Sequence, residues 1–94
     1  MTNYNIKYSK SFKKQLKKIT KQGKDIDKLL AIVEKLSKGQ KLEQKYKDHA
    51  LNDNKYYQNC RECHIEPDWL LVYKKNNKEL ILFLIETGTH SDLF

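Results

Sequence analysis

The sequence predicts an α+β fold in which a mostly antiparallel sheet carries an N-terminal pair of helices on one face. Two amphipathic helical segments fill most of residues 9–39, and three strand-like segments fill most of residues 56–86. A short alternating strand precedes the helices, which gives the element order βααβββ. The chain has 94 residues, a length that supports a single core, so we expect one domain spanning residues 1–94.

The first half of the chain contains the first strand and both helices. Residues 3–8 alternate between apolar and polar side chains, as expected for a strand. Ser9 or Ser11 suits the N-cap of a helix that runs to about Lys21, and a second helix is expected over residues 25–38. Only a few residues connect the helices, so they are expected to pack as an antiparallel hairpin.

The second half of the chain is expected to supply most of the sheet. Residues 41–54 lack a clear period and are interpreted as a loop that can hold one helical turn. The expected strands are residues 56–66, 69–74 and 79–86. Pro67-Asp68 and Asn76-Asn77 have the composition of the turns between them.

The chain is strongly basic, with a formal net charge of +7 and a pI of about 9.4. The excess positive charge lies in residues 1–50, whereas residues 51–94 carry slightly more acidic than basic side chains. Such a basic half either binds an anionic partner or only keeps a small protein soluble. No apolar run is long enough for a signal peptide or a membrane span, so we expect a cytoplasmic protein with no membrane partner.

The two cysteines, Cys60 and Cys63, form a C-x-x-C pair. A zinc site would require two more soft ligands, and side chains three positions apart on a strand point to opposite faces. A redox pair normally starts at a helix N-terminus, whereas this pair lies in a strand-like segment. We therefore interpret both as small core or surface residues and expect no metal and no cofactor.

The stretch from Arg61 to Trp69, R-E-C-H-I-E-P-D-W, concentrates the ionisable side chains. In a strand, Glu62 and His64 share one face with Cys60 and Glu66, while Arg61, Cys63 and Ile65 share the other face. Several ionisable groups on one face are costly to bury and are useful at a cleft. The strand is expected to end at Pro67, which places Asp68 and Trp69 close to His64.

All three histidines lie outside the predicted helices: His49 in the loop, His64 in the sheet and His90 after the last strand. Histidine titrates near neutral pH and can act as a base or an acid. RNA supplies its own nucleophile, the 2′-hydroxyl group, so an enzyme that cleaves it needs only proton transfer and phosphate stabilisation. With a basic half and exposed aromatic residues, the histidines suggest acid–base chemistry on a nucleic acid.

Three blocks of the sequence are similar to the YafQ branch of the RelE/ParE-type bacterial toxins. They are Y-K-D-H-A-L from Tyr46, R-E-C-H-I-E-P-D-W-L-L-V-Y from Arg61 and T-G-T-H-S-D-L-F from Thr87. The resemblance implies a RelE-like fold and an endoribonuclease, an mRNA interferase, that enters the ribosomal A site and cuts mRNA. It also implies a ribbon-helix-helix antitoxin of the DinJ type, with operator DNA bound only through the toxin–antitoxin complex.

The resemblance assigns functional positions to His49, His64, Asp68, His90 and Phe94. We assign His49 or His64 as the base, His90 as the acid, and Asp68 as a group that orients a histidine or the 2′-hydroxyl; which histidine is the base and which the acid stays open.

Glu62 stands where relatives carry an acid and joins the catalytic candidates. Trp69 matches an aromatic residue beside the aspartate and is a candidate RNA contact, although it suits a core position equally well. Phe94 either stacks on an RNA base or is a frayed chain end. The first-helix lysines are expected to face ribosomal RNA: Lys13, Lys14, Lys17, Lys18 and Lys21.

One position departs from the family pattern. Many relatives carry an arginine just before the T-G-T-H block, where this chain has Glu86. A glutamate would repel the developing negative charge unless it points away, so Arg61 or a lysine is expected to contact RNA in its place. Two alternatives to an RNA-cleaving toxin therefore remain open: a weak relative that blocks translation by binding, and a structural partner of the antitoxin in operon repression.

Overall fold

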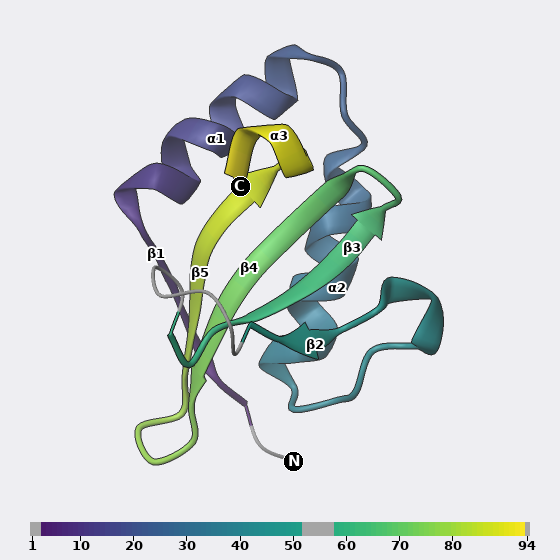
Figure 1. Cartoon of the computed structure of the whole chain (residues 1–94). Helices are drawn as coiled ribbons and strands as arrows, with labels where there is room; N and C mark the ends of the chain where they lie inside the picture. The colour runs from purple at the N-terminus through teal and green to yellow at the C-terminus, as the bar shows by residue number, and fades with distance from the viewer. Residues whose placement is uncertain (1–2, 52–57, 94) are drawn as a thin grey trace.

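The computed structural model describes residues 3–51 and 58–93 and confirms the predicted α+β class. Its elements are β1 (Asn5–Tyr8), α1 (Lys10–Lys21), α2 (Ile26–Ser37), η1 (Gln44–Tyr46), β2 (His49–Ala50), β3 (Arg61–Glu66), β4 (Trp69–Asn76), β5 (Ile81–Gly88) and α3 (His90–Leu93) (Figure 1). Both long helices and the expected strands are present, but β3 is shorter than the expected strand over residues 56–66: residues 58–59 form a turn, and residues 56–57 lie outside the described residues. The helical turn allowed within the expected loop is present as η1, whereas two short elements were not predicted: β2 in the same loop and α3 in the tail.

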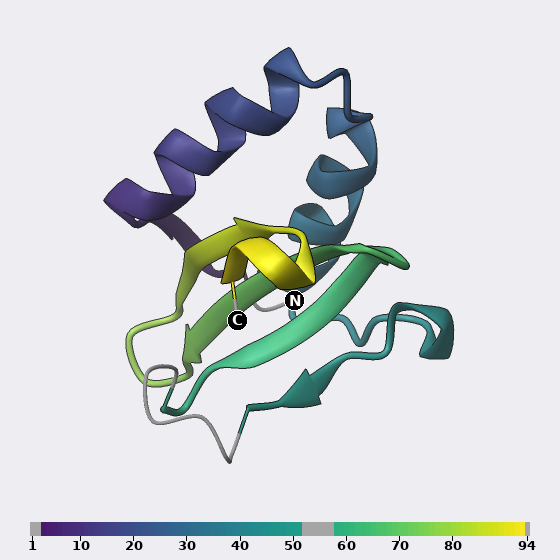
Figure 2. The same ribbon diagram turned by 45° about the horizontal axis from the view of Figure 1, so that its top comes forward.

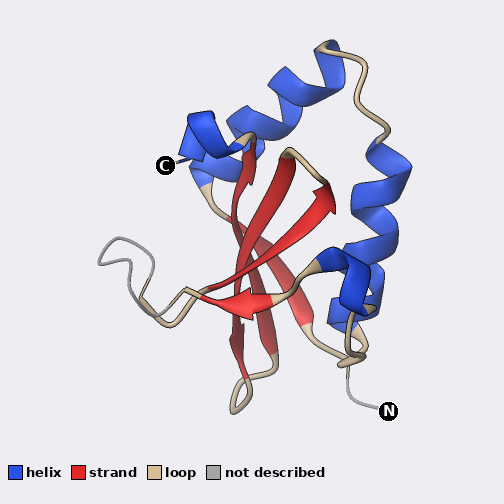
Figure 3. Cartoon of the chain, turned by 45° about the vertical axis from the view of Figure 1, so that its right-hand side comes forward, coloured by secondary structure: helices blue, strands red, loops and turns tan. Residues whose placement is uncertain are grey.

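The sheet has five strands in the order β1-β5-β4-β3-β2 (Figure 3). β1 runs parallel to β5, whereas the other neighbours are antiparallel, so the prediction of a mostly antiparallel sheet is confirmed. β4 lies at the centre and its first five residues are buried, as its continuous apolar run predicts. β2 adds a short edge strand beside β3, which brings the preceding loop onto the sheet.

The two long helices begin and end where the sequence predicts. The Ser9 hydroxyl accepts a hydrogen bond from Phe12 N at 2.9 Å, and the Asp25 carboxylate accepts one from Asp27 N at 3.2 Å. Gly23 follows the first helix with φ +82°, a conformation that glycine adopts without strain. Of the two serines that suited the first N-cap, Ser9 forms it, and Asp25 caps the second helix.

The helix pair is more open than an antiparallel hairpin. α1 and α2 lie on the same face of the sheet but diverge widely from their connection (Figure 2). α1 packs mainly against β5, and α2 contacts β3. Each helix buries its apolar stripe on the sheet, which explains why the two helices need little contact with each other.

The core lies between these helices and the sheet and includes Trp69, which is 1% exposed. Its indole Nε1 donates to Thr87 Oγ1 at 2.9 Å, and that hydroxyl donates to the Leu70 carbonyl at 2.8 Å. The buried polar atoms of the tryptophan and the threonine are thus satisfied. The prediction that Trp69 contacts RNA is wrong, and the alternative of a core residue is confirmed.

Cys60 and Cys63 are free and buried, which confirms that the C-x-x-C pair belongs to the core. Burial raises the pKa of both thiols, so neither has the character of a reactive thiolate. In residues 3–51 and 58–93, no helix is long and apolar enough to cross a membrane.

Candidate functional site

Two histidines meet at one buried carboxylate. His49 of β2 lies directly opposite Glu62 of β3, and His64 follows Glu62 by two residues on the same face of the strand. Glu62 is only 3% exposed, and its Oε1 lies 3.6 Å from His49 Nε2 and 3.7 Å from His64 Nε2. The structure therefore brings three predicted site residues together, and β2, which was not predicted as a strand, places His49 there.

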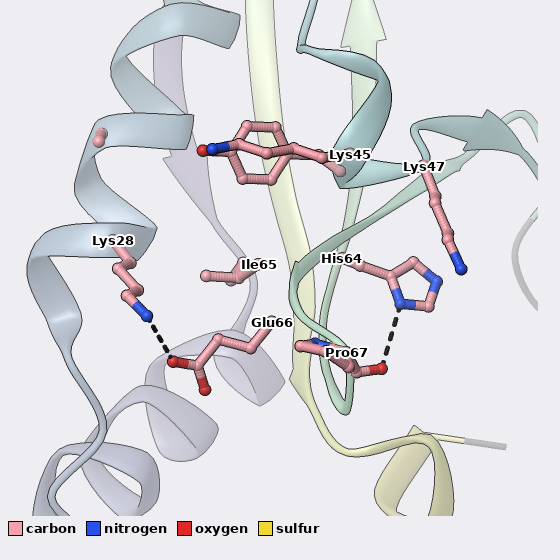
Figure 4. Close-up of a pocket in the computed structure, with 9 residues that line it drawn as sticks. Lys28, Lys45, Lys47, His64, Ile65, Glu66 and Pro67 are labelled. Carbon is pink, nitrogen blue, oxygen red and sulfur yellow. Dashed lines mark hydrogen bonds and ion pairs between the residues drawn. The ribbon is translucent and has the colours of Figure 1, made fainter.

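The second nitrogen of each ring faces a backbone carbonyl. His49 Nδ1 lies 2.7 Å from Lys47 O. His64 Nδ1 lies 3.3 Å from Pro67 O, as Figure 4 shows. A carbonyl only accepts hydrogen bonds, so each Nδ1 must carry the proton. The neutral form of either ring then has an unprotonated Nε2. In both rings Nε2 is the nitrogen that lies near the Glu62 carboxylate, whose negative charge would stabilise a positive charge on the ring.

A second carboxylate holds the loop that carries His49. Asp48 Oδ1 accepts hydrogen bonds from Tyr73 Oη at 2.6 Å and from Arg61 Nε at 3.2 Å. Burial, followed by the bond to Asp48, raises the pKa of Tyr73, so its hydroxyl stays protonated and can donate. Neither Asp48 nor Tyr73 was among the predicted site residues. In the sequence, Tyr73 looks like an ordinary core residue of a buried strand.

Arg61 helps to hold the loop before His49 and does not lie on the face of the sheet that carries His49 and His64. It pairs with Tyr73 across β3 and β4, and its side chain points to the face of the sheet opposite Glu62. Its guanidinium group is held by Asp48. We therefore assign Arg61 to the loop support and do not retain it as a substitute for the missing arginine.

The remaining catalytic candidates lie at the end of the sheet where β3 ends and β5 ends. Leu70 pairs with Gly88, which brings the Pro67-Asp68 turn beside the start of α3. Asp68 Oδ1 accepts a hydrogen bond from the backbone N–H of His90 at 3.4 Å. Asp68, which was expected to orient a histidine or the 2′-hydroxyl, thus contacts the backbone of His90.

Residues 89–92 form a reciprocal cap that sets the position of His90. Asp92 N donates to Thr89 Oγ1, and Thr89 N donates to the Asp92 carboxylate, both at 3.2 Å. The hydrogen bond from the Thr89 backbone N–H to the carboxylate is the main reason why the pKa of Asp92 lies below its usual range. A Cβ added at Gly88, where φ is +159°, would lie 3.3 Å from Asp92 Cβ and Oδ2, so glycine leaves room for the cap.

Glu66 does not share the face of Glu62 and His64, contrary to the alternation expected for a regular strand. The β3–β4 register shifts between His64 and Glu66, which leaves one extra residue on β3. The Glu66 carboxylate instead contacts α2 through Lys28 Nζ at 2.9 Å, and Lys24 Nζ lies 3.7 Å away. The Lys28 hydrogen bond is the main reason why the pKa of Glu66 is lowered.

Glu86 lies on the catalytic face. Glu62 pairs with Val72, and Val72 pairs with Glu86, so the two glutamates stand in one row across the sheet on the same side. The lysines predicted to bind RNA, Lys13, Lys14, Lys17 and Lys18, are exposed on α1, as is Lys21. The positive charge of Lys18 makes a small contribution to the lowered pKa of Asp92.

The prediction that Phe94 contacts RNA is not tested, because Phe94 lies outside the described residues. Within residues 3–51 and 58–93, no group of three or more histidine, cysteine, aspartate or glutamate side chains is arranged to hold a metal ion.

Residues 4–94 match the protein family described as bacterial toxin of type II toxin-antitoxin system, YafQ. The chain is 37% identical over 95 residues to the mRNA interferase toxin YafQ of Escherichia coli K12, covering 100% of this chain and 99% of that protein. The crystal structure of a metal-bound toxin from Helicobacter pylori is 44% identical, with a TM-score of 0.89 and coverage of 97% and 99%. The Escherichia coli DinJ-YafQ toxin-antitoxin complex contains a chain that is 35% identical, with a TM-score of 0.87 and 98% of both chains covered.

Proposed function

Because the chain belongs to the YafQ family of toxins from bacterial type II toxin-antitoxin systems, we propose that it cleaves mRNA by histidine acid–base catalysis without a metal. Family membership confirms the resemblance carried by the three sequence blocks and identifies the chain as an mRNA interferase, an endoribonuclease. The observation that supports the catalytic mechanism is the Glu62 carboxylate within 3.7 Å of both His49 and His64.

Cleavage begins when the Nε2 of His49 or His64 takes the proton from the 2′-hydroxyl group of the substrate. The resulting oxygen forms a bond to the adjacent phosphorus, and Glu62 stabilises the imidazolium ion. The bond from phosphorus to the 5′-oxygen then breaks, and His90 donates a proton to that oxygen. The products are a 2′,3′-cyclic phosphate upstream and a 5′-hydroxyl group downstream.

The substrate is expected to be mRNA in the A site of a ribosome, so the protein acts in the cytoplasm. The exposed α1 lysines suit contact with ribosomal RNA, while Phe94 remains a proposed stacking residue. The relatives in DinJ-YafQ complexes support a DinJ-like antitoxin, proposed to be of the ribbon-helix-helix type. Operator DNA would be bound only through that complex.

The direct test is to induce the isolated chain and map the cut sites in cellular mRNA. We expect growth arrest and new 5′ ends for the natural chain and for Lys78→Ala, an exposed control in the β4–β5 turn. His64→Ala and His90→Ala should each slow cleavage by about 10²–10⁴-fold, because each removes a proton-transfer group. The catalytic assignment would be refuted if both histidine variants still cut mRNA at the same sites and remained toxic while their circular dichroism spectra were native.

Glu86 supports a second candidate function, a weak enzyme that stops translation mainly by occupying the ribosome. Its carboxylate lies in the row of Glu62, where a negative charge opposes that of the phosphorane. Growth arrest without new mRNA ends would favour this candidate.

A further inference from the structure

A groove of about 450 Å³ opens between α2, η1 and the end of β3 (Figure 4). Its apolar surface includes the side chains of Tyr46 and Ile65, and its polar rim carries Lys28, Lys45 and Lys47. Tyr46 packs partly against the core, which fixes its ring at the groove. An aromatic ring beside an apolar floor, with cations at the rim, matches a nucleotide, which has an aromatic base and an anionic phosphate.

The charge of the groove favours an anionic ligand. Glu66 is the acidic residue that lines it, and its carboxylate is held by Lys28 at 2.9 Å, with Lys24 at 3.7 Å. Lys45 and Lys47 do not pair with Glu66, and Lys45 Nζ instead lies 4.0 Å from the exposed Glu43 carboxylate. A phosphate at the rim would therefore meet two lysines whose charge Glu66 does not neutralise.

The groove is continuous with the catalytic cluster. His64 forms part of its lining (Figure 4). The same imidazole lies 3.7 Å from the Glu62 carboxylate. A phosphate positioned at His64 would leave one of its neighbouring nucleosides within reach of the groove. A binding site far from the histidines would lack this connection.

We propose that this groove is a nucleotide subsite in which Tyr46 stacks on the base next to the scissile phosphate, and this inference rests on the proposed RNA cleavage. Lys45 and Lys47 bind the phosphate of that nucleotide. Lys45 Nζ now lies 5.1 Å from the centre of the Tyr46 ring, in a cation–π contact at an exposed site. RNA replaces this contact, because the phosphate takes the ammonium group and the base takes the ring.

The test combines one protein change with one substrate change. Ribosomes are programmed with one of three short messages: the intact message, one that lacks the base just upstream of the cut, or one that lacks the base just downstream of it. Cleavage of each message is measured with the natural chain and with Tyr46→Leu. Tyr8→Leu is the matched control, because Tyr8 is 50% exposed on β1, at the opposite edge of the sheet from β2. Stacking of one base is worth about 5- to 150-fold in affinity, which sets the expected size of the effect.

We expect loss of one neighbouring base to raise KM at least about fivefold for the natural chain and for Tyr8→Leu. Tyr46→Leu should raise KM similarly on the intact message, with little added effect when the same base is missing. This non-additivity would show that ring and base act as one contact.

Two outcomes would overturn the subsite. One is an unchanged KM for both abasic messages with the natural chain, which can be measured whether or not Tyr46→Leu folds. The other is a Tyr46→Leu chain that cleaves normally but loses affinity for the antitoxin, which would make the groove a protein contact. In either case the natural chain still cuts the intact message, whereas no cutting at all would refute the proposed function itself.

Discussion

At the scale of single residues, Glu62 connects the two histidines to the sheet. It is 3% exposed, and a buried carboxylate requires compensating partners. The imidazoles of His49 and His64 approach the same oxygen, so the negative charge can stabilise a positive charge on either ring. Its role is to position and stabilise these groups, since the proton itself passes through the imidazoles.

Changing Glu62 to Gln should lower kcat and leave KM nearly unchanged. The amide keeps the shape of the side chain but removes the charge that stabilises the imidazolium ion in the transition state. The loss should be smaller than the roughly 10²–10⁴-fold loss expected for removal of a proton-transfer group. Single-turnover cleavage measures this. A normal kcat in a folded Glu62→Gln protein would remove the carboxylate from the mechanism.

Changing Glu86 to Arg should raise the cleavage rate or leave it unchanged. Glu86 lies in the same row as Glu62, and an arginine there would stabilise the developing negative charge. The rate on programmed ribosomes should be compared with that of Glu79→Arg, an equal charge change in the exposed β4–β5 turn. A large loss of activity in folded Glu86→Arg alone would give the natural glutamate a positive role of its own.

The sequence could predict the cluster only in part. Strand alternation correctly placed Glu62 and His64 on one face, but only the β2–β3 pairing shows that His49 joins them. The same alternation misplaced Glu66, because one extra residue in β3 reverses the faces and carries no clear signal. Trp69 was ambiguous for a different reason, since an aromatic residue beside a turn suits both a core and a binding surface.

At the scale of elements, the short helix α3 determines where His90 lies. Its position depends on the Thr89–Asp92 cap and on the contact between Asp68 and the His90 backbone. The cap was visible in the sequence as T-H-S-D, the pattern of a capping box, although four polar residues near a chain end carry no helical period. Long helices and strands were predictable because their apolar period repeats, which short elements do not allow.

Asp92 makes the order of α3 sensitive to acid. Its folded-state pKa is lowered by the bonds from Thr89, so the cap stabilises the folded state above the ordinary aspartate pKa, near 3.9, and is lost as the pH falls through the lower folded value. The Thr89 and Asp92 amide signals should therefore titrate below pH ~3.9 in NMR spectra. Titration at or above that value would contradict the cap.

At the scale of the whole molecule, one face of the sheet is covered by the helices and the other carries the catalytic side chains. The sequence predicted this division because apolar stripes on two helices require a sheet face to cover them. It did not predict the wide angle between α1 and α2, which depends on how each helix packs on the sheet (Figure 2). The basic charge of α1 remains on the outer surface, where Lys13 and Lys17 are exposed.

Reversing Lys13 and Lys17 to Glu should weaken ribosome binding and flatten its salt dependence. Each phosphate contact that is lost should lower the slope of log K against log salt by roughly 0.7–0.9. The matched control is Lys41→Glu with Lys78→Glu, an equal charge change in two exposed loops. If the two double variants gave equal slopes of log K against log salt, the α1 lysines would not contact RNA phosphates and would serve only solubility.

The nucleophile is the central claim, and a message with a single 2′-deoxy nucleotide just upstream of the cut tests it most directly. The account predicts that ribosomes carrying this message bind the toxin normally and that the message stays whole, because the attacking oxygen is absent. The matched all-ribose message should be cut to leave a 2′,3′-cyclic phosphate and a 5′-hydroxyl end. Cleavage of the deoxy message at the normal rate would show that water or a metal hydroxide attacks the phosphorus, and would contradict the histidine mechanism.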